Sequence, residues 1–65
     1  MSDILPELCR VEAVQDIWED GEVALKGSRG TVVYAYDNGI GYVVEFTSPN
    51  HLVIGASRDE LQLKG

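Results

Sequence analysis

The residues of this chain that could do chemistry are few, because histidine and cysteine occur once each, as His51 and Cys9. His51 could complete a Ser-His-Asp triad by composition, but no serine lies in the Gly-x-Ser-x-Gly pattern of a nucleophile elbow. We therefore interpret His51 as the start of a strand beside a turn. One histidine and one cysteine also fall short of the four ligands of a structural zinc site. The sequence predicts no catalytic residue, no metal site and no cofactor, and hence no enzyme.

A cluster of acidic residues surrounds Trp18, the only tryptophan. Its spacing is not the Asp-x-Asp-x-Asp-Gly pattern of a calcium loop, and such a cluster is often only a solvated loop. Trp18 itself has two interpretations, which stay open: it packs over one end of the core, or it is an exposed anchor of the kind enriched in protein interfaces. In the second case the acidic residues would favour a cationic partner. The cluster consists of Asp16, Glu19, Asp20 and Glu22.

Nucleic-acid binding is a second possibility that two patterns raise. Gly27-Ser28-Arg29-Gly30 matches the Gly-x-x-Gly of KH loops, but a strand rather than a helix follows it here, so we interpret it as a turn. Tyrosines could stack bases as in small nucleic-acid-binding barrels, although sheet tyrosines more often pack in the fold. This function would need a basic face built from Lys26, Arg29, Arg58 or Arg10.

The charge balance opposes binding to a polyanion. The 65 residues include 5 Lys plus Arg and 11 Asp plus Glu, which gives a net charge of −6. Such a chain repels a nucleic-acid duplex at long range, whereas its acidity favours basic partners. No stretch approaches the roughly 20 apolar residues of a membrane-spanning helix, so we expect no membrane contact. A lone cysteine fits a reducing cytoplasm, where we expect the protein.

The stretch from Gly27 to Phe46 predicts a β-hairpin around which the fold is organised. Thr31–Tyr36 is rich in the β-branched and aromatic residues that suit strands. Asn38-Gly39 fits a tight turn with positive φ angles, although the following Ile40-Gly41 leaves a longer loop or a bulge open. In the second strand, apolar and polar residues alternate, which predicts that Val44 and Phe46 face inward and Glu45 faces water.

The other predicted elements are short, and they suggest one domain at residues 10–65 preceded by an N-terminal arm at residues 1–9. Ser57 and Glu60 have the spacing of a helical capping box. Ser48-Pro49-Asn50 is typical of a turn. The predicted elements are a strand over Arg10–Gln15, a loop over Asp16–Glu22, a short strand over Val23–Lys26, a strand over His51–Ser57, a helical turn over Ser57–Glu60 and a last strand over Leu61–Leu63.

Five short strands with turns between them indicate an all-β fold, a small SH3-like barrel with a helical turn before the last strand. Gly27-x-x-Gly30-Thr31-Val32-Val33 followed by Tyr42-x-Val44-Glu45-Phe46 resembles a family of very short bacterial proteins, domain of unknown function 4926. The resemblance covers roughly residues 10–63. It implies an SH3-like barrel, with no established activity and no catalytic residue. The chain lacks the proline often found in the first loop of that family.

From these observations we expect a non-catalytic protein-interaction module that binds a protein or peptide with a basic surface. A narrower form of this hypothesis is an antitoxin-like or immunity-like partner of a basic protein, and a homo-oligomer stays open. The alternative is a small nucleic-acid-binding barrel. The expected partner-binding residues are Asp16, Trp18, Glu19, Asp20, Glu22, Tyr34, Tyr36 and Tyr42.

Overall fold

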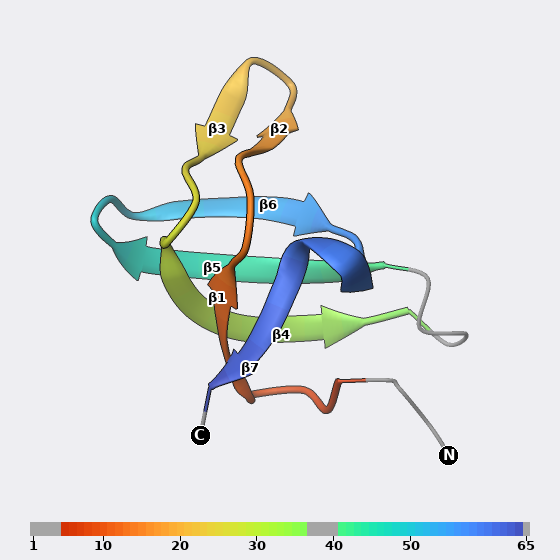
Figure 1. Cartoon of the computed structure of the whole chain (residues 1–65). Coiled ribbons are helices and arrows are strands. Elements are labelled where there is room, and N and C mark those ends of the chain that lie inside the picture. The colour runs from red at the N-terminus through yellow and green to blue at the C-terminus, as the bar shows by residue number, and fades with distance from the viewer. Residues whose placement is uncertain (1–4, 37–40, 65) are drawn as a thin grey trace.

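The computed structural model describes residues 5–36 and 41–64, and short antiparallel strands make up most of this part of the chain (Figure 1). The predicted all-β class is therefore confirmed. The elements in chain order are β1 (Arg10–Ala13), β2 (Ile17–Glu19), β3 (Glu22–Ala24), β4 (Arg29–Ala35), β5 (Tyr42–Ser48), β6 (Leu52–Ala56), the 3-10 helix η1 (Arg58–Glu60) and β7 (Leu61–Lys64).

Five of the strands form one sheet in the order β6-β5-β4-β1-β7, and every neighbouring pair in it is antiparallel. These five correspond to the five main strands that the sequence predicts. The sheet is strongly coiled, so that β1 and β7 run steeply across the direction of β4, β5 and β6 (Figure 1). Strands β6 and β7 are the edges of this sheet. In the described part of the chain, no strand pairing joins these two edges.

The hairpin predicted between Gly27 and Phe46 is confirmed as the β4–β5 pair. Val32 lies opposite Val44, and both are buried, as is Phe46. Glu45 on the alternate face is partly exposed, as the alternation predicts. The predicted turn at Asn38-Gly39 lies outside the described residues.

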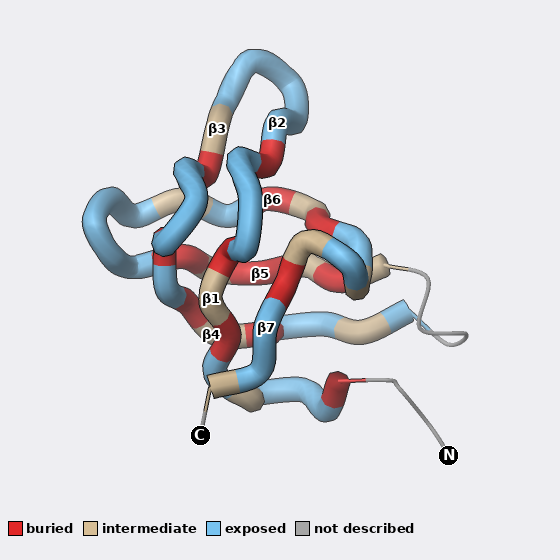
Figure 2. The backbone as a smooth tube through the Cα atoms, viewed as in Figure 1, coloured by how far each residue is buried: buried red, intermediate tan, exposed pale blue. Residues whose placement is uncertain are grey.

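The core lies on the inner face of the coiled sheet and receives side chains from every strand (Figure 2). The segment before β1 contributes as well, because Leu5 is buried and the Leu8 N–H donates a 2.6 Å hydrogen bond to the Val32 carbonyl. Ile54 and Ala56, which alternate along β6, both face this core. The buried apolar residues are Leu5, Val11, Ala13, Ile17, Ala24, Val32, Tyr42, Val44, Phe46, Ile54, Ala56 and Leu61.

The helical turn predicted before the last strand is confirmed as η1. The Ser57 N–H donates to Glu60 Oε1 at 2.8 Å, which satisfies a main-chain donor at the start of the turn. The chain then enters β7, which pairs with β1 through Leu61 opposite Ala13. No helix in residues 5–36 and 41–64 is long and apolar enough to cross a lipid bilayer.

The loop predicted over Asp16–Glu22 is wrong, because β2 and β3 form a second, two-stranded sheet there. The reversal is made by Asp20 and Gly21, whose φ angles are +51° and +81°. A two-residue turn with positive φ at both positions matches the right-handed twist of the flanking strands, and Asp-Gly is among its preferred sequences. The acidic stretch is therefore a β-hairpin rather than an irregular loop.

Candidate functional site

The β2–β3 hairpin projects from the main sheet, beyond β6 (Figure 1). Its register pairs Ile17 with Ala24 and Trp18 with Val23. Because directly opposite residues of an antiparallel pair share a face, Ile17 and Ala24 point together into the core, where both are buried. Trp18 and Val23 form the outer face. Trp18 is 71% exposed, so its interpretation as a core residue is wrong.

Two of the four acidic residues expected to bind a partner instead hold the hairpin in place. Asp16 Oδ1 accepts a hydrogen bond of 2.8 Å from the main-chain N–H of Lys26, which closes the base of the hairpin. Glu19 Oε1 accepts one of 2.6 Å from the main-chain N–H of Gly55 on β6. These carboxylates therefore have local structural roles, which no pattern in the sequence predicts.

The other two acidic residues, Asp20 and Glu22, stand exposed at the tip of the hairpin. Neither carboxylate forms an ion pair with a residue in the described part of the chain. Their charges are therefore directed to solvent. Asp20 lies in the turn, and Glu22 lies opposite Glu19, so Glu22 is on the face of the hairpin that Trp18 does not occupy. The structure thus combines an exposed aromatic ring with two uncompensated negative charges.

A recess of about 110 Å³, lined mostly by apolar residues, lies between β3 and the turn that joins β5 to β6. Val23 belongs both to the outer face of the hairpin and to the recess, since it lies opposite Trp18 and also lines the recess. The sequence predicts a short strand that contains Val23, but not the pairing of Val23 with Trp18. The Asp20-Gly21 pair, a hairpin signal, would have supplied that connection. The recess is lined by Val23, Ala24, Leu25, Ser28, Phe46, Pro49, Asn50 and Leu52.

The tyrosines expected to share the recognition face do not all lie on it. Tyr34 and Tyr36 are 47% and 50% exposed, and their rings meet edge to face with centroids 5.1 Å apart. A bulge between Val32 and Tyr34 changes the register, which turns Tyr34 away from the core. Tyr34 is the second-last residue of β4 and Tyr36 directly follows that strand, whose end lies well away from the β2–β3 hairpin (Figure 1).

Tyr42 is a core residue, so the prediction that it contacts a partner is wrong. Only 1% of it is exposed, and it is among the largest fully buried side chains. Its hydroxyl oxygen accepts a 2.9 Å hydrogen bond from the Leu5 N–H, which satisfies the polar end of the ring inside the fold. Tyr42 therefore cannot contact a partner without unfolding of the surrounding strands.

The residues with catalytic or metal-binding chemistry are dispersed. His51, which directly precedes β6, has its Nε2 2.7 Å from Oε2 of Glu45 on β5, in an exposed pair. Cys9 is partly buried against the core, and this burial raises the pKa of its thiol. In the residues that the structure describes, no group of three His, Cys, Asp or Glu side chains could hold a metal ion.

Comparison of the chain with protein-family models, curated proteins and solved structures finds no match. The resemblance to domain of unknown function 4926 therefore stays a prediction.

Proposed function

We propose that this chain is a non-catalytic protein-interaction module that binds a basic protein or peptide through the outer face of the β2–β3 hairpin. The observation that carries the proposal is the exposure of Trp18, 71%, on a hairpin that Asp16 closes at its base and that Glu19 joins to β6. Tryptophan is the residue type most enriched in interface hot spots, where it supplies large apolar contact area and one hydrogen-bond donor.

The chemistry of the surface indicates what kind of partner would fit. The recess beside Val23 suits an apolar side chain of the partner, and Asp20 and Glu22 would attract lysine or arginine residues around it. Asp16 and Glu19 contribute differently, by holding the hairpin in one position before binding. A preorganised surface loses less conformational entropy on association.

The scaffold that we propose for this surface is an SH3-like barrel, for which the five-stranded sheet supplies the strands in the expected order along the chain. In the narrower form of the proposal, the chain is an antitoxin-like or immunity-like protein that neutralises a basic partner in the cytoplasm. The net charge of −6 and the exposed acidic tip support this form.

The experiment compares capture of proteins from a lysate of the native host by the immobilised wild-type chain and by four variants. Trp18→Ala removes the aromatic anchor, and the double change Asp20→Asn with Glu22→Gln removes the tip charges without changing side-chain size. Val53→Ala is the matched apolar control, because Val53 is 50% exposed on β6. Glu7→Gln with Asp59→Asn removes the same charge at other exposed positions.

The expected result is a basic protein that the wild type and both controls retain, that Trp18→Ala loses, and that the tip variant binds with several-fold slower association. The difference between the tip variant and the wild type should shrink at high salt. Circular dichroism must first show that each variant is folded. Equal capture by the folded Trp18→Ala variant and the wild type would rule out this surface as the binding site.

A further inference from the structure

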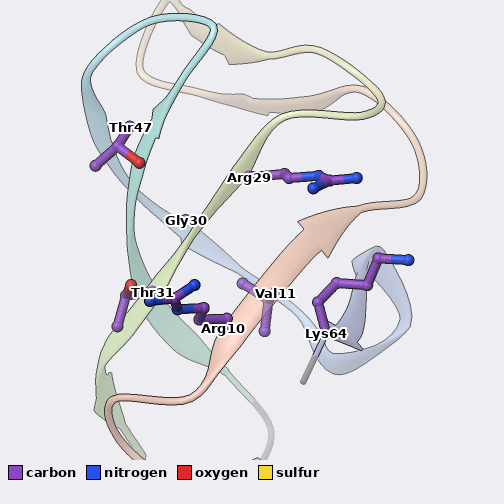
Figure 3. Close-up of a pocket in the computed structure, with 7 residues that line it drawn as sticks. All are labelled: Arg10, Val11, Arg29, Gly30, Thr31, Thr47 and Lys64. Atoms are coloured by element: carbon purple, nitrogen blue, oxygen red, sulfur yellow. The ribbon is translucent and has the colours of Figure 1, made fainter.

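A second surface gathers most of the positive charge of this acidic chain. Three of its five basic residues line one pocket of about 440 Å³ on the outer side of β7, β1 and β4 (Figure 3). The pocket is separate from the β2–β3 hairpin, which contributes no residue to it. Its lining consists of Arg10, Val11, Arg29, Gly30, Thr31, Thr47 and Lys64.

The sheet register explains why residues so distant in sequence meet here. Arg10 on β1 lies opposite Lys64 on β7 and also opposite Thr31 on β4. Residues directly opposite one another share a face of the sheet, so Lys64, Arg10 and Thr31 form a row across three strands. Glu12 lies opposite Arg29 in the next row along the same face.

The floor of the pocket is formed where β4 approaches β5 without a side chain between them. A Cβ atom added at Gly30 would lie 2.7 Å from Phe46 Cα, so only glycine allows this approach. The register shifts beside Gly30, which leaves Thr47 as an extra residue of β5 facing the pocket. Figure 3 shows Arg29 and Lys64 to one side of Gly30, and Thr31 and Thr47 to the other.

The charges of the pocket are only partly compensated. Glu12 Oε1 lies 3.3 Å from Arg29 Nε and 3.7 Å from Lys64 Nζ, so one carboxylate forms ion pairs with two cations. The Arg10 side chain forms no ion pair with any residue in the described ranges. The pocket therefore carries two positive charges in excess, on a chain whose net charge is −6.

We propose that this pocket binds a small molecule that carries a phosphate group. Arginine guanidinium groups donate paired hydrogen bonds to phosphate oxygens, and lysine adds a point charge. The hydroxyl groups of Thr31 and Thr47 add neutral donors in the same pocket. Its volume lies within the roughly 300–1,000 Å³ of small-molecule sites. A small ligand is favoured over a nucleic acid because the acidic remainder of the surface repels a polyanion.

The test titrates isotope-labelled protein at low salt with pyrophosphate and follows the amide resonances of Gly30, Thr31 and Thr47. Saturable shifts confined to this pocket are expected. Arg10→Gln should weaken binding about tenfold, as for the loss of one charge-assisted hydrogen bond. Lys26→Gln is the matched control, since it removes the same charge elsewhere in the chain, and it should change the affinity less than about twofold.

A second pair of variants tests the role of the shared carboxylate. Glu12→Gln should strengthen pyrophosphate binding several-fold, because it frees Arg29 and Lys64 from their present counter-charge. Glu22→Gln removes the same charge from the tip of the hairpin and should have little effect. Trp18→Ala should also leave pyrophosphate affinity unchanged, so this result does not depend on the protein-binding surface.

Four outcomes would overturn the assignment. They are the absence of saturable shifts, an equal loss of affinity in Arg10→Gln and Lys26→Gln, and citrate binding as tight as that of pyrophosphate, which would indicate a carboxylate site. The fourth is much tighter binding of single-stranded oligonucleotides with affinity that rises with length, which would indicate a nucleic-acid surface.

Discussion

Glu19 and Gly55, far apart in the sequence, are joined by a hydrogen bond of 2.6 Å from the Gly55 main-chain N–H to Glu19 Oε1. The bond joins the β2–β3 hairpin to β6, and a side chain at Gly55 would displace the Glu19 carboxylate. A Cβ atom at Gly55 would lie 2.8 Å from Glu19 Oε2. The position of the exposed Trp18 thus depends on a carboxylate that faces the other side of the same hairpin.

Glu19→Ala and Gly55→Ala should each destabilise the fold by about 1 kcal/mol, because each removes or displaces the same charge-assisted hydrogen bond. The double variant should be little less stable than either single variant, since both changes remove one interaction. Urea unfolding measures these free energies, and Glu7→Ala is the control for loss of an exposed carboxylate. Fully additive losses would show that the two residues act independently.

The main strands could be predicted from the sequence because their signals are local. Alternation placed Val44 and Phe46 inside, and the Ser57–Glu60 spacing gave the helical turn. The sequence does not decide whether Trp18 is buried or exposed, because a large aromatic residue in a short segment fits either side of a hairpin whose register is unknown. The Asp20-Gly21 turn fixes that register, and the burial of Ile17 and Ala24 on one face of the hairpin places Trp18 on the other, exposed face.

The basic pocket and the hydrogen bonds that hold the β2–β3 hairpin could not be predicted, because they depend on contacts between segments that are distant in the sequence. Arg10, Arg29 and Lys64 look scattered along the chain, and only the order β7-β1-β4 brings them together. Similarly, nothing local to Glu19 distinguishes it from Asp20, although one is bonded to β6 and the other faces solvent. Tyr42 lies two residues before Val44 in β5 and therefore shares its buried face. This alternation predicts a core position for Tyr42 rather than a surface position.

Gly30→Ala should destabilise the protein strongly, by about 1–3 kcal/mol, as expected for overpacking where strands meet closely. The new methyl group would lie against the main chain of β5, which cannot move aside as a flexible side chain can. Gly41→Ala is the matched control, because its methyl group would meet Tyr36 Cδ2 at 3.5 Å, an ordinary contact. Thermal unfolding of both variants checks the prediction, and similar melting temperatures would contradict it.

The Cys9 thiol should react slowly in the folded protein at neutral pH. Its burial raises the pKa, an effect only partly opposed by a hydrogen bond to its own main chain and by the charge of Arg58. Since the thiolate is the reactive form, alkylation by iodoacetamide should be slower in the folded chain than in urea. The rate should also rise with pH at a higher midpoint.

The raised pKa of the Cys9 thiol also makes the free energy of unfolding depend on pH. The folded state holds the thiol proton more tightly than the unfolded state, so this contribution to stability is complete below the pKa of the unfolded thiol. It is then lost as the pH rises through the pKa of the folded thiol. Cys9→Ser should remove that part of the alkaline loss of stability, and an unchanged alkaline profile would exclude Cys9 as its source.

Trp18 is the only tryptophan, so its fluorescence reports directly on the proposed protein-binding surface. With 71% of the residue exposed, its emission maximum should lie close to that of free tryptophan in water. The charges of Asp20 and Glu22 should concentrate cations near the ring. At low salt, caesium should therefore quench Trp18 more efficiently than it quenches a neutral indole compound in solution. Iodide should quench Trp18 less efficiently than it quenches the same compound.

This asymmetry should disappear when salt shortens the screening length to about 3 Å near 1 M. It should also fall in the variant with Asp20→Asn and Glu22→Gln, whereas Glu7→Gln with Asp59→Asn should preserve most of it. The second comparison separates the local field of the hairpin tip from the net charge of the chain, since both variants lose two negative charges. If caesium and iodide each quenched the wild type as efficiently as they quench a neutral indole compound, the tip carboxylates would create no field at Trp18, and a cationic partner would then gain nothing from them.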